Sequence, residues 1–131
     1  MINLNWDLSA LYENETALNT DLENAKERAK SFEMVCKGKF KTLHVNEFLE
    51  AIREYEAINE TLGRIMTYAF LNFATDSDKG GFYAKYQKEY TKIAEHLLFF
   101  ELEFNNLPKA KQEEFIATCS SYRYYLESLM L

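Results

Sequence analysis

The stretch FYAKYQKEYTKIAEHLLFFELEF, residues 82–104, carries the most regular hydrophobic pattern of the chain. Its apolar residues follow one another at intervals of four, four, three, four, three and four positions: Phe82, Tyr86, Tyr90, Ile93, Leu97, Phe100 and Phe104. Residues at such intervals share one face of an α-helix. The pattern therefore predicts a single helix that ends near residue 105, where Asn105, Asn106 and Pro108 interrupt it.

Two further helices are predicted before this one. The range 14–36, which Gly38 should terminate, has one apolar stripe: Leu18, Leu22, Ala25, Ala29, Phe32 and Cys36. The range 46–74, with Asn46 as its expected N-cap, has another: Phe48, Ile52, Tyr55, Ile58, Leu62, Ile65, Ala69 and Phe73. Gly63 inside the second helix indicates a close contact with another helix, because an interior glycine costs about 1 kcal/mol against alanine.

The remaining segments complete an all-α fold. TDSDKGG, residues 75–81, predicts a short turn, so the helices on either side should form a long antiparallel hairpin. KAKQEEFIA, residues 109–117, predicts a short helix with Pro108 in its first turn, and YRYYLESLML, 122–131, another after a polar gap. NWDLSALY, 5–12, is expected to pack on the body as an anchoring arm. We expect one domain over residues 1–131, an antiparallel hairpin or bundle of about four to five helices.

The composition excludes several classes of protein. With 47% hydrophobic and 15% aromatic residues the chain should fold, and its net charge of −6 would repel a phosphate backbone, so no nucleic-acid partner is expected. Lys37, Lys39 and Lys41 form the only basic cluster, and cations at the end of a helix are favoured over an anion site. The start MINLNWDLSA lacks the pattern of a signal peptide, and no apolar run is long enough for a membrane span, so a cytoplasmic location without membrane contact is expected.

The segment HLLFFELEFNNLP, residues 96–108, places three candidate ligands in the most apolar part of the chain: His96, Glu101 and Glu103. On a helical wheel His96 and Glu103 share one polar gap but lie about 10 Å apart along the axis, and Glu101 points elsewhere. They cannot hold one metal ion together, since its ligands lie about 2.0 to 2.2 Å away. Hydrogen-bonded structural side chains are expected instead, and Leu98, Phe99 and Leu102 should form a second buried face.

Other catalytic patterns also lack support. Cys36 and Cys119 have no metal or redox spacing and are expected to be buried thiols, and pairing Cys36 with His44, or Cys119 with His96, would be a coincidence of composition. Adjacent carboxylates such as Glu113 and Glu114 are expected on a solvated face. The chain contains no HExxH motif. No catalytic, cofactor-binding or metal-binding residue is therefore assigned in this chain.

Four stretches together resemble the N-terminal region of oligoendopeptidase F-type, thimet-oligopeptidase-like zinc metallopeptidases. They occur in the family's order: NWDLSALY (5–12), EAIREYEAINETLGRIMTYAFLNFATDSD (50–78), HLLFFELEFNNLP (96–108) and YRYYLES (122–128). Each stretch alone is unspecific, and the resemblance depends on all four. It covers nearly the whole chain and departs from the family pattern at Gly80 and Gly81.

The resemblance implies a helical, non-catalytic domain that forms part of the wall of a peptidase channel and gates entry of oligopeptide substrates. The zinc of such an enzyme, and the catalytic domain that holds it, would lie downstream of Leu131, so this region alone is expected to be inactive. The apolar end Leu129, Met130 and Leu131 is expected at a fragment boundary or a packing face. The alternative is a standalone helical module that docks a partner through this end.

Overall fold

The computed structural model describes residues 10–75, 78 and 80–130, and every regular element formed by these residues is helical. The α-helices have these bounds: α1 Glu15–Cys36, α2 Val45–Thr75, α3 Gly80–Glu95, α4 Leu98–Asn105, α5 Lys109–Thr118 and α6 Arg123–Leu129. Short 3-10 helices precede α2 and α6: η2 Phe40–Thr42 and η4 Ser120–Tyr122. The predicted all-α class is confirmed.

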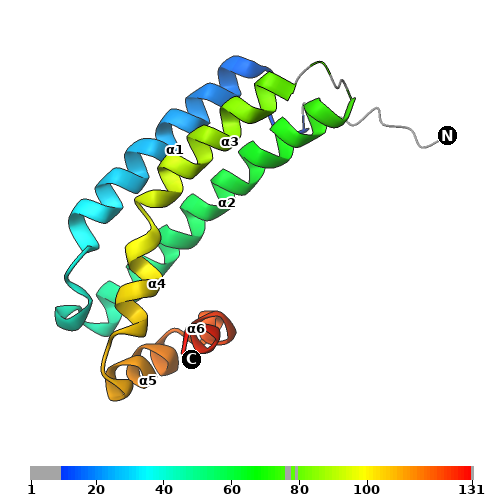
Figure 1. Ribbon diagram of the computed structural model, residues 1–131. Coiled ribbons are helices and arrows are strands. Elements are labelled where there is room, and N and C mark those ends of the chain that lie inside the picture. The colour runs from blue at the N-terminus through cyan, green and yellow to red at the C-terminus, as the bar shows by residue number, and fades with distance from the viewer. Residues whose placement is uncertain (1–9, 76–77, 79, 131) are drawn as a thin grey trace.

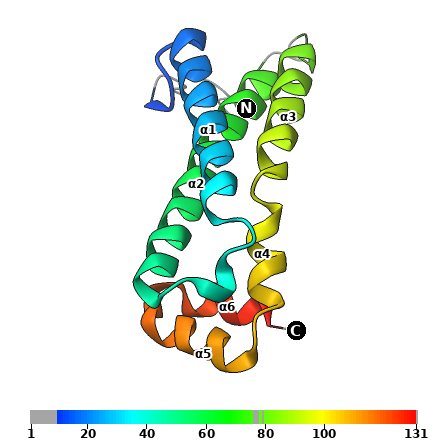
Figure 2. The ribbon, with the colours of Figure 1, turned by 90° about the vertical axis from the view of Figure 1, so that its left-hand side faces the viewer.

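The three long helices α1, α2 and α3 run side by side, with α2 antiparallel to both neighbours (Figure 1). The α2–α3 pair is the predicted hairpin. The chain of α3 then passes into α4, and α5 and α6 lie across the foot of the three-helix body (Figure 2). α5 packs on α2, and α6 contacts both α4 and α5.

α1 follows the sequence prediction closely. The Asn14 side chain caps the helix by accepting a hydrogen bond of 2.9 Å from the Ala17 amide. The whole predicted stripe from Leu18 to Cys36 is buried. The helix ends where predicted: Lys37 already has an extended ψ of 130°, and Gly38 follows with a φ of 81°, which is strained for residues with a side chain.

Two expectations about α2 are wrong. Asn46 does not cap the helix, which already begins at Val45; the Glu47 carboxylate instead accepts the His44 amide at 2.9 Å, as the third residue of a capping box does. Gly63 makes no close helix contact either, since a Cβ added there would meet nothing within 4 Å. No contact among the described residues therefore explains why a glycine, which is less favourable in a helix than alanine, occupies this position.

The predicted third helix is two helices. At His96 and Leu97 the hydrogen bonds change to the 3-10 pattern, in which an amide bonds the carbonyl three residues earlier. The His96 amide lies 3.0 Å from the Ile93 carbonyl, and the Leu97 amide lies 2.9 Å from the Ala94 carbonyl. Leu97 still enters the core, and α4 continues toward α6 (Figure 2). Because no Gly or Pro marks this point, the break results from tertiary packing rather than from local propensity.

The burial pattern of this region is also partly different from the prediction. Phe99 is buried as expected, but Leu98 and Leu102 of the supposed second apolar face are 62% and 64% exposed. Tyr90, assigned to the main stripe, is 38% exposed. Phe73 of the α2 stripe is only partly buried. α4 therefore buries one face, which is wider than the predicted stripe because it includes Phe99.

An aromatic core joins the long helices to the foot. The ring of Phe48 stacks on Phe115 of α5 with centroids 4.1 Å apart, and Tyr55 stacks on Phe100 of α4 at the same distance. Gln112 of α5 closes the end of α4 by donating to the Phe104 carbonyl at 2.8 Å. The predicted fourth and fifth helices are confirmed as α5 and α6, but Pro108 is the N-cap residue of α5 rather than part of its first turn.

The ends of the chain are only partly described. Residues 5–9 of the predicted arm lie outside the described residues, but Tyr12 is buried and packs edge-on against Tyr68 at 5.5 Å. Residues 76, 77 and 79 of the predicted turn 75–81 also lie outside them, whereas Thr75 ends α2 and Gly80 begins α3. Leu129 and Met130 are partly buried against the core. None of the helices that the described residues form combines the length and hydropathy needed to cross a membrane.

Candidate functional site

His96 lies at the break between α3 and α4 and faces α1. Its Nδ1 atom is 3.0 Å from Oε1 of Glu33, and the other carboxylate oxygen of Glu33 lies 3.7 Å from the Lys37 ammonium. The hydrogen bond from His96, with the Lys37 charge, lowers the pKa of Glu33. The histidine therefore ties the helix break to α1.

Glu103 of α4 binds the loop after α1 through hydrogen bonds to backbone amides. Its carboxylate accepts the Gly38 amide at 2.7 Å and the Phe40 amide at 3.5 Å. These two amides belong to the loop that leaves α1 and enters η2. Glu103 thus accepts hydrogen bonds from two loop amides that have no backbone acceptor among the described residues.

Glu101 belongs to a third cluster, which contains two tyrosines. The Tyr125 hydroxyl of α6 donates to Oε1 of Glu101 at 2.9 Å and lies 3.1 Å from the Tyr55 hydroxyl of α2. Tyr55 is also 3.4 Å from the same carboxylate oxygen. One carboxylate on α4 therefore binds phenols from two other helices.

The phenols of this cluster remain protonated near neutral pH. Burial raises the pKa of Tyr55, and burial together with the neighbouring Tyr55 and Glu101 raises that of Tyr125. A neutral phenol donates a hydrogen bond but is a poor general base. The cluster is suited to holding α2, α4 and α6 together, and a small hollow of about 130 Å³ beside it, lined in part by Asn59 and Leu98, is too small for a peptide.

The three candidates of the segment 96–108 thus have separate partners and do not form one site. Among residues 10–75, 78 and 80–130, no three His, Cys, Asp or Glu side chains are gathered as metal ligands would be. His44 stands before the first turn of α2, where its amide is bound by Glu47. Glu113 and Glu114 are exposed on α5, as expected.

The two cysteines are buried free thiols, as predicted. Burial raises the pKa of both Cys36 and Cys119, which opposes formation of the nucleophilic thiolate. His96, whose pairing with Cys119 was expected to be only a coincidence of composition, bonds Glu33. Neither thiol has the environment of a catalytic nucleophile.

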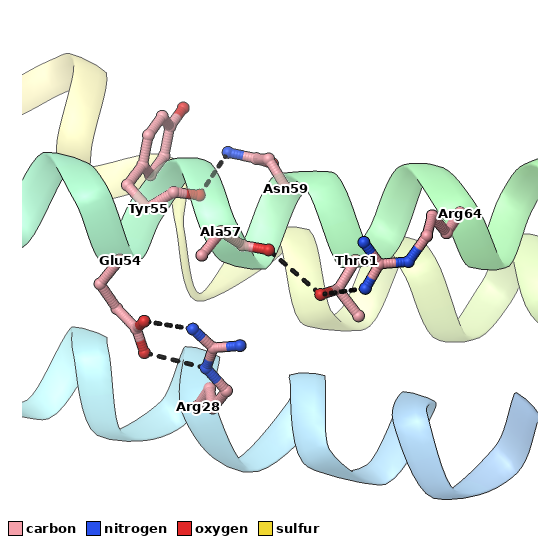
Figure 3. Close-up of polar contacts among 7 residues, drawn as sticks. All are labelled: Arg28, Glu54, Tyr55, Ala57, Asn59, Thr61 and Arg64. Carbon is pink, nitrogen blue, oxygen red and sulfur yellow. Dashed lines mark hydrogen bonds and ion pairs between the residues drawn. The ribbon is translucent and has the colours of Figure 1, made fainter. Parts of the chain in front are cut away.

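α1 and α2 are joined on their outer side by a bidentate ion pair. The Arg28 guanidinium binds both carboxylate oxygens of Glu54, with its Nε 3.1 Å from Oε2 (Figure 3). Further along α2, the side chains of Asn59 and Thr61 donate hydrogen bonds to backbone carbonyls one turn earlier in the same helix. The Arg64 guanidinium donates to the Thr61 hydroxyl at 3.3 Å. The Arg28–Glu54 pair links the two helices beside a groove.

This groove, of about 490 Å³, lies between the last turns of α1 and the first half of α2. It is lined by apolar and charged side chains: Ser31, Phe32, Val35, Cys36, Lys39, Leu43, Glu47, Glu50, Ala51 and Glu54. We call it the α1–α2 groove. Its volume falls in the range of roughly 300–1,000 Å³ that is usual for ligand sites.

Comparison of the chain with protein families, curated proteins and solved structures finds no match. The described residues therefore have to be interpreted from their own chemistry. They form structural polar clusters and several surface hollows, among which the α1–α2 groove combines an apolar floor with an acidic edge.

Two of these features depend on contacts that hydrophobic periodicity does not encode. Tyr55, Glu101 and Tyr125 are 46 and 24 positions apart, so only the fold brings them together. The α1–α2 groove depends on how two helices and the loop between them are packed. Val35 was the available signal for the groove, because it is an apolar residue outside the buried stripe of α1.

Proposed function

We propose that this chain is the N-terminal, non-catalytic domain of a zinc-dependent oligoendopeptidase, forming part of the wall that gates peptide entry to a channel. The observation that carries the proposal is the order of four sequence stretches, at residues 5–12, 50–78, 96–108 and 122–128, which resemble that family. The catalytic zinc and its ligands would be supplied by a domain downstream in the same polypeptide. Short peptides would be the substrates of the whole enzyme.

The roles of the side chains in the resembling stretches support the proposal. In 96–108, the polar residues His96, Glu101 and Glu103 bind α1, α6 and the α1–α2 loop rather than one another. Such side chains fix the relative positions of helices, which is what a rigid wall requires. The long helices supply the extended surface of such a wall (Figure 1).

The coding sequence beyond Leu131 tests this proposal. We expect an HExxH motif several hundred residues downstream, on a predicted helix, because two histidines one turn apart bind zinc and the glutamate between them is the general base. A stop codon after Leu131, or a downstream region without this motif, would refute the proposal. The alternative of a standalone module that docks a partner through its apolar C-terminal end would then be the one to test.

A further inference from the structure

The α1–α2 groove presents apolar surface that the described helices leave uncovered. Phe32, Cys36 and Ala51 form buried walls, whereas Val35 at the edge is 62% exposed. Exposed apolar side chains that border a hollow are typical of interaction sites.

One side of the groove is acidic. Glu47, Glu50 and Glu54 follow one another on α2 at intervals of three and four, so they share one face of the helix. Glu54 is engaged by Arg28 (Figure 3) and Glu47 by the His44 amide. Glu50 makes no ion pair with any cation of residues 10–75, 78 and 80–130. Lys39 is the one cation among the residues that line the groove, and it lies on the loop after α1, so Glu50 is the carboxylate on the α2 side that remains for a partner.

The shape and charge of the groove select its occupant. A site with an apolar floor and a carboxylate edge complements a helix whose apolar face is bordered by lysine or arginine. A second copy of this chain is a poor fit, because its net charge is −6 and like charges would meet. A nucleic acid or an anionic lipid surface would be repelled by the same carboxylates.

We propose that the α1–α2 groove docks a basic amphipathic helix of a partner protein. An apolar side chain of that helix packs on Val35 and Ala51, and a lysine or arginine faces Glu50. The inference goes beyond the proposed peptidase domain and does not rest on it, since it uses only the groove and its charges.

The proposal can be tested by fluorescence anisotropy with the 131-residue chain and a labelled synthetic helix bearing leucine on one face and lysine on the other. We expect saturable binding that weakens as NaCl is added. Val35→Asp should raise Kd about tenfold by removing the apolar anchor. Glu50→Lys should raise it about fivefold and reduce the salt dependence.

Two matched variants on other parts of the surface serve as controls. Leu102→Asp changes an apolar residue as exposed as Val35, and Glu114→Lys reverses an exposed charge on α5. Both should leave Kd unchanged, and circular dichroism should show all four variants folded. Equal loss of binding in the controls would mean nonspecific attraction and would overturn the proposal.

Three further outcomes would also overturn it. The first is equal binding of a peptide of the same composition whose apolar face is scrambled. The second is equal or tighter binding of the version with glutamate in place of lysine. The third is self-association of the chain, measured by analytical ultracentrifugation, if Val35→Asp abolishes it. In that case a second copy of the chain would occupy the groove.

Discussion

Glu103 connects α4 to the loop between α1 and α2 through two backbone amides, those of Gly38 and Phe40. Its neighbour Glu101 connects α4 to α2 and α6 through tyrosine hydroxyls. At the scale of single residues, the carboxylates of this apolar segment are therefore structural. The wheel correctly placed them on different sides of the helix, but it could not name their partners, which lie 24 to 65 positions away.

Replacing Glu103 with alanine tests this role. We expect the free energy of unfolding to fall by about 1–2 kcal/mol, because two amides lose a charged acceptor at a partly exposed site. Urea denaturation monitored by circular dichroism measures the change. Glu114→Ala, which removes an exposed carboxylate from α5, should change it by less than about 0.5 kcal/mol. Equal values for the two variants would contradict the role assigned to Glu103.

Tyr12 gives a prediction about pH. Burial, with the hydrogen bond to Asp21, raises the pKa of Tyr12 from 10.0 to about 12. The folded state then keeps a proton that the unfolded state has lost, so this contribution to stability is complete below pH 10 and is lost as the pH rises toward 12. The loss amounts to at most about 1.4 kcal/mol per pH unit.

The variant Tyr12→Phe should therefore lose less stability between pH 10 and 12 than the wild type. Tyr124→Phe is the control, since Tyr124 is 88% exposed, and it should follow the wild-type curve. Urea titrations at several pH values measure the slopes. Parallel curves for Tyr12→Phe and the wild type would show that the tyrosine titrates normally.

At the scale of elements, hydrophobic periodicity predicted most helices, their order and the stripe of α1. It failed where tertiary contacts decide, namely at the break before α4 and at Leu98 and Leu102, which are exposed. Periodicity shows which residues share a face of a helix, but it does not show whether another helix packs against that face. The α1–α2 groove was missed for the same reason.

Phe100 on α4 shows what the predicted stripe contributes to stability. Its side chain is fully buried, stacks on Tyr55 at 4.1 Å and lies edge-on to Phe40 at 5.3 Å. Phe100→Ala should cost about 3–5 kcal/mol, through lost burial and the cavity left behind. Thermal and urea unfolding measure this. Leu102→Ala, in the same helix but 64% exposed, should cost less than about 0.5 kcal/mol, and similar costs for both would contradict the orientation of α4.

At the scale of the whole molecule, three long helices and a transverse foot form an all-α body whose described polar clusters bind helices to one another (Figures 1 and 2). The catalytic residues of the proposed enzyme cannot be predicted from this chain, because the proposal locates its zinc ligands downstream of Leu131.

The most direct test of the proposed function compares two purified proteins in one peptidase assay with a fluorescence-quenched oligopeptide. The 131-residue chain should be inactive with or without added zinc. The longer polypeptide that contains this region and the expected downstream HExxH domain should cleave the peptide, lose activity to a chelator and regain it with zinc. Zinc-dependent cleavage by the 131-residue chain alone, or a longer polypeptide that remains inactive when loaded with zinc, would contradict the account.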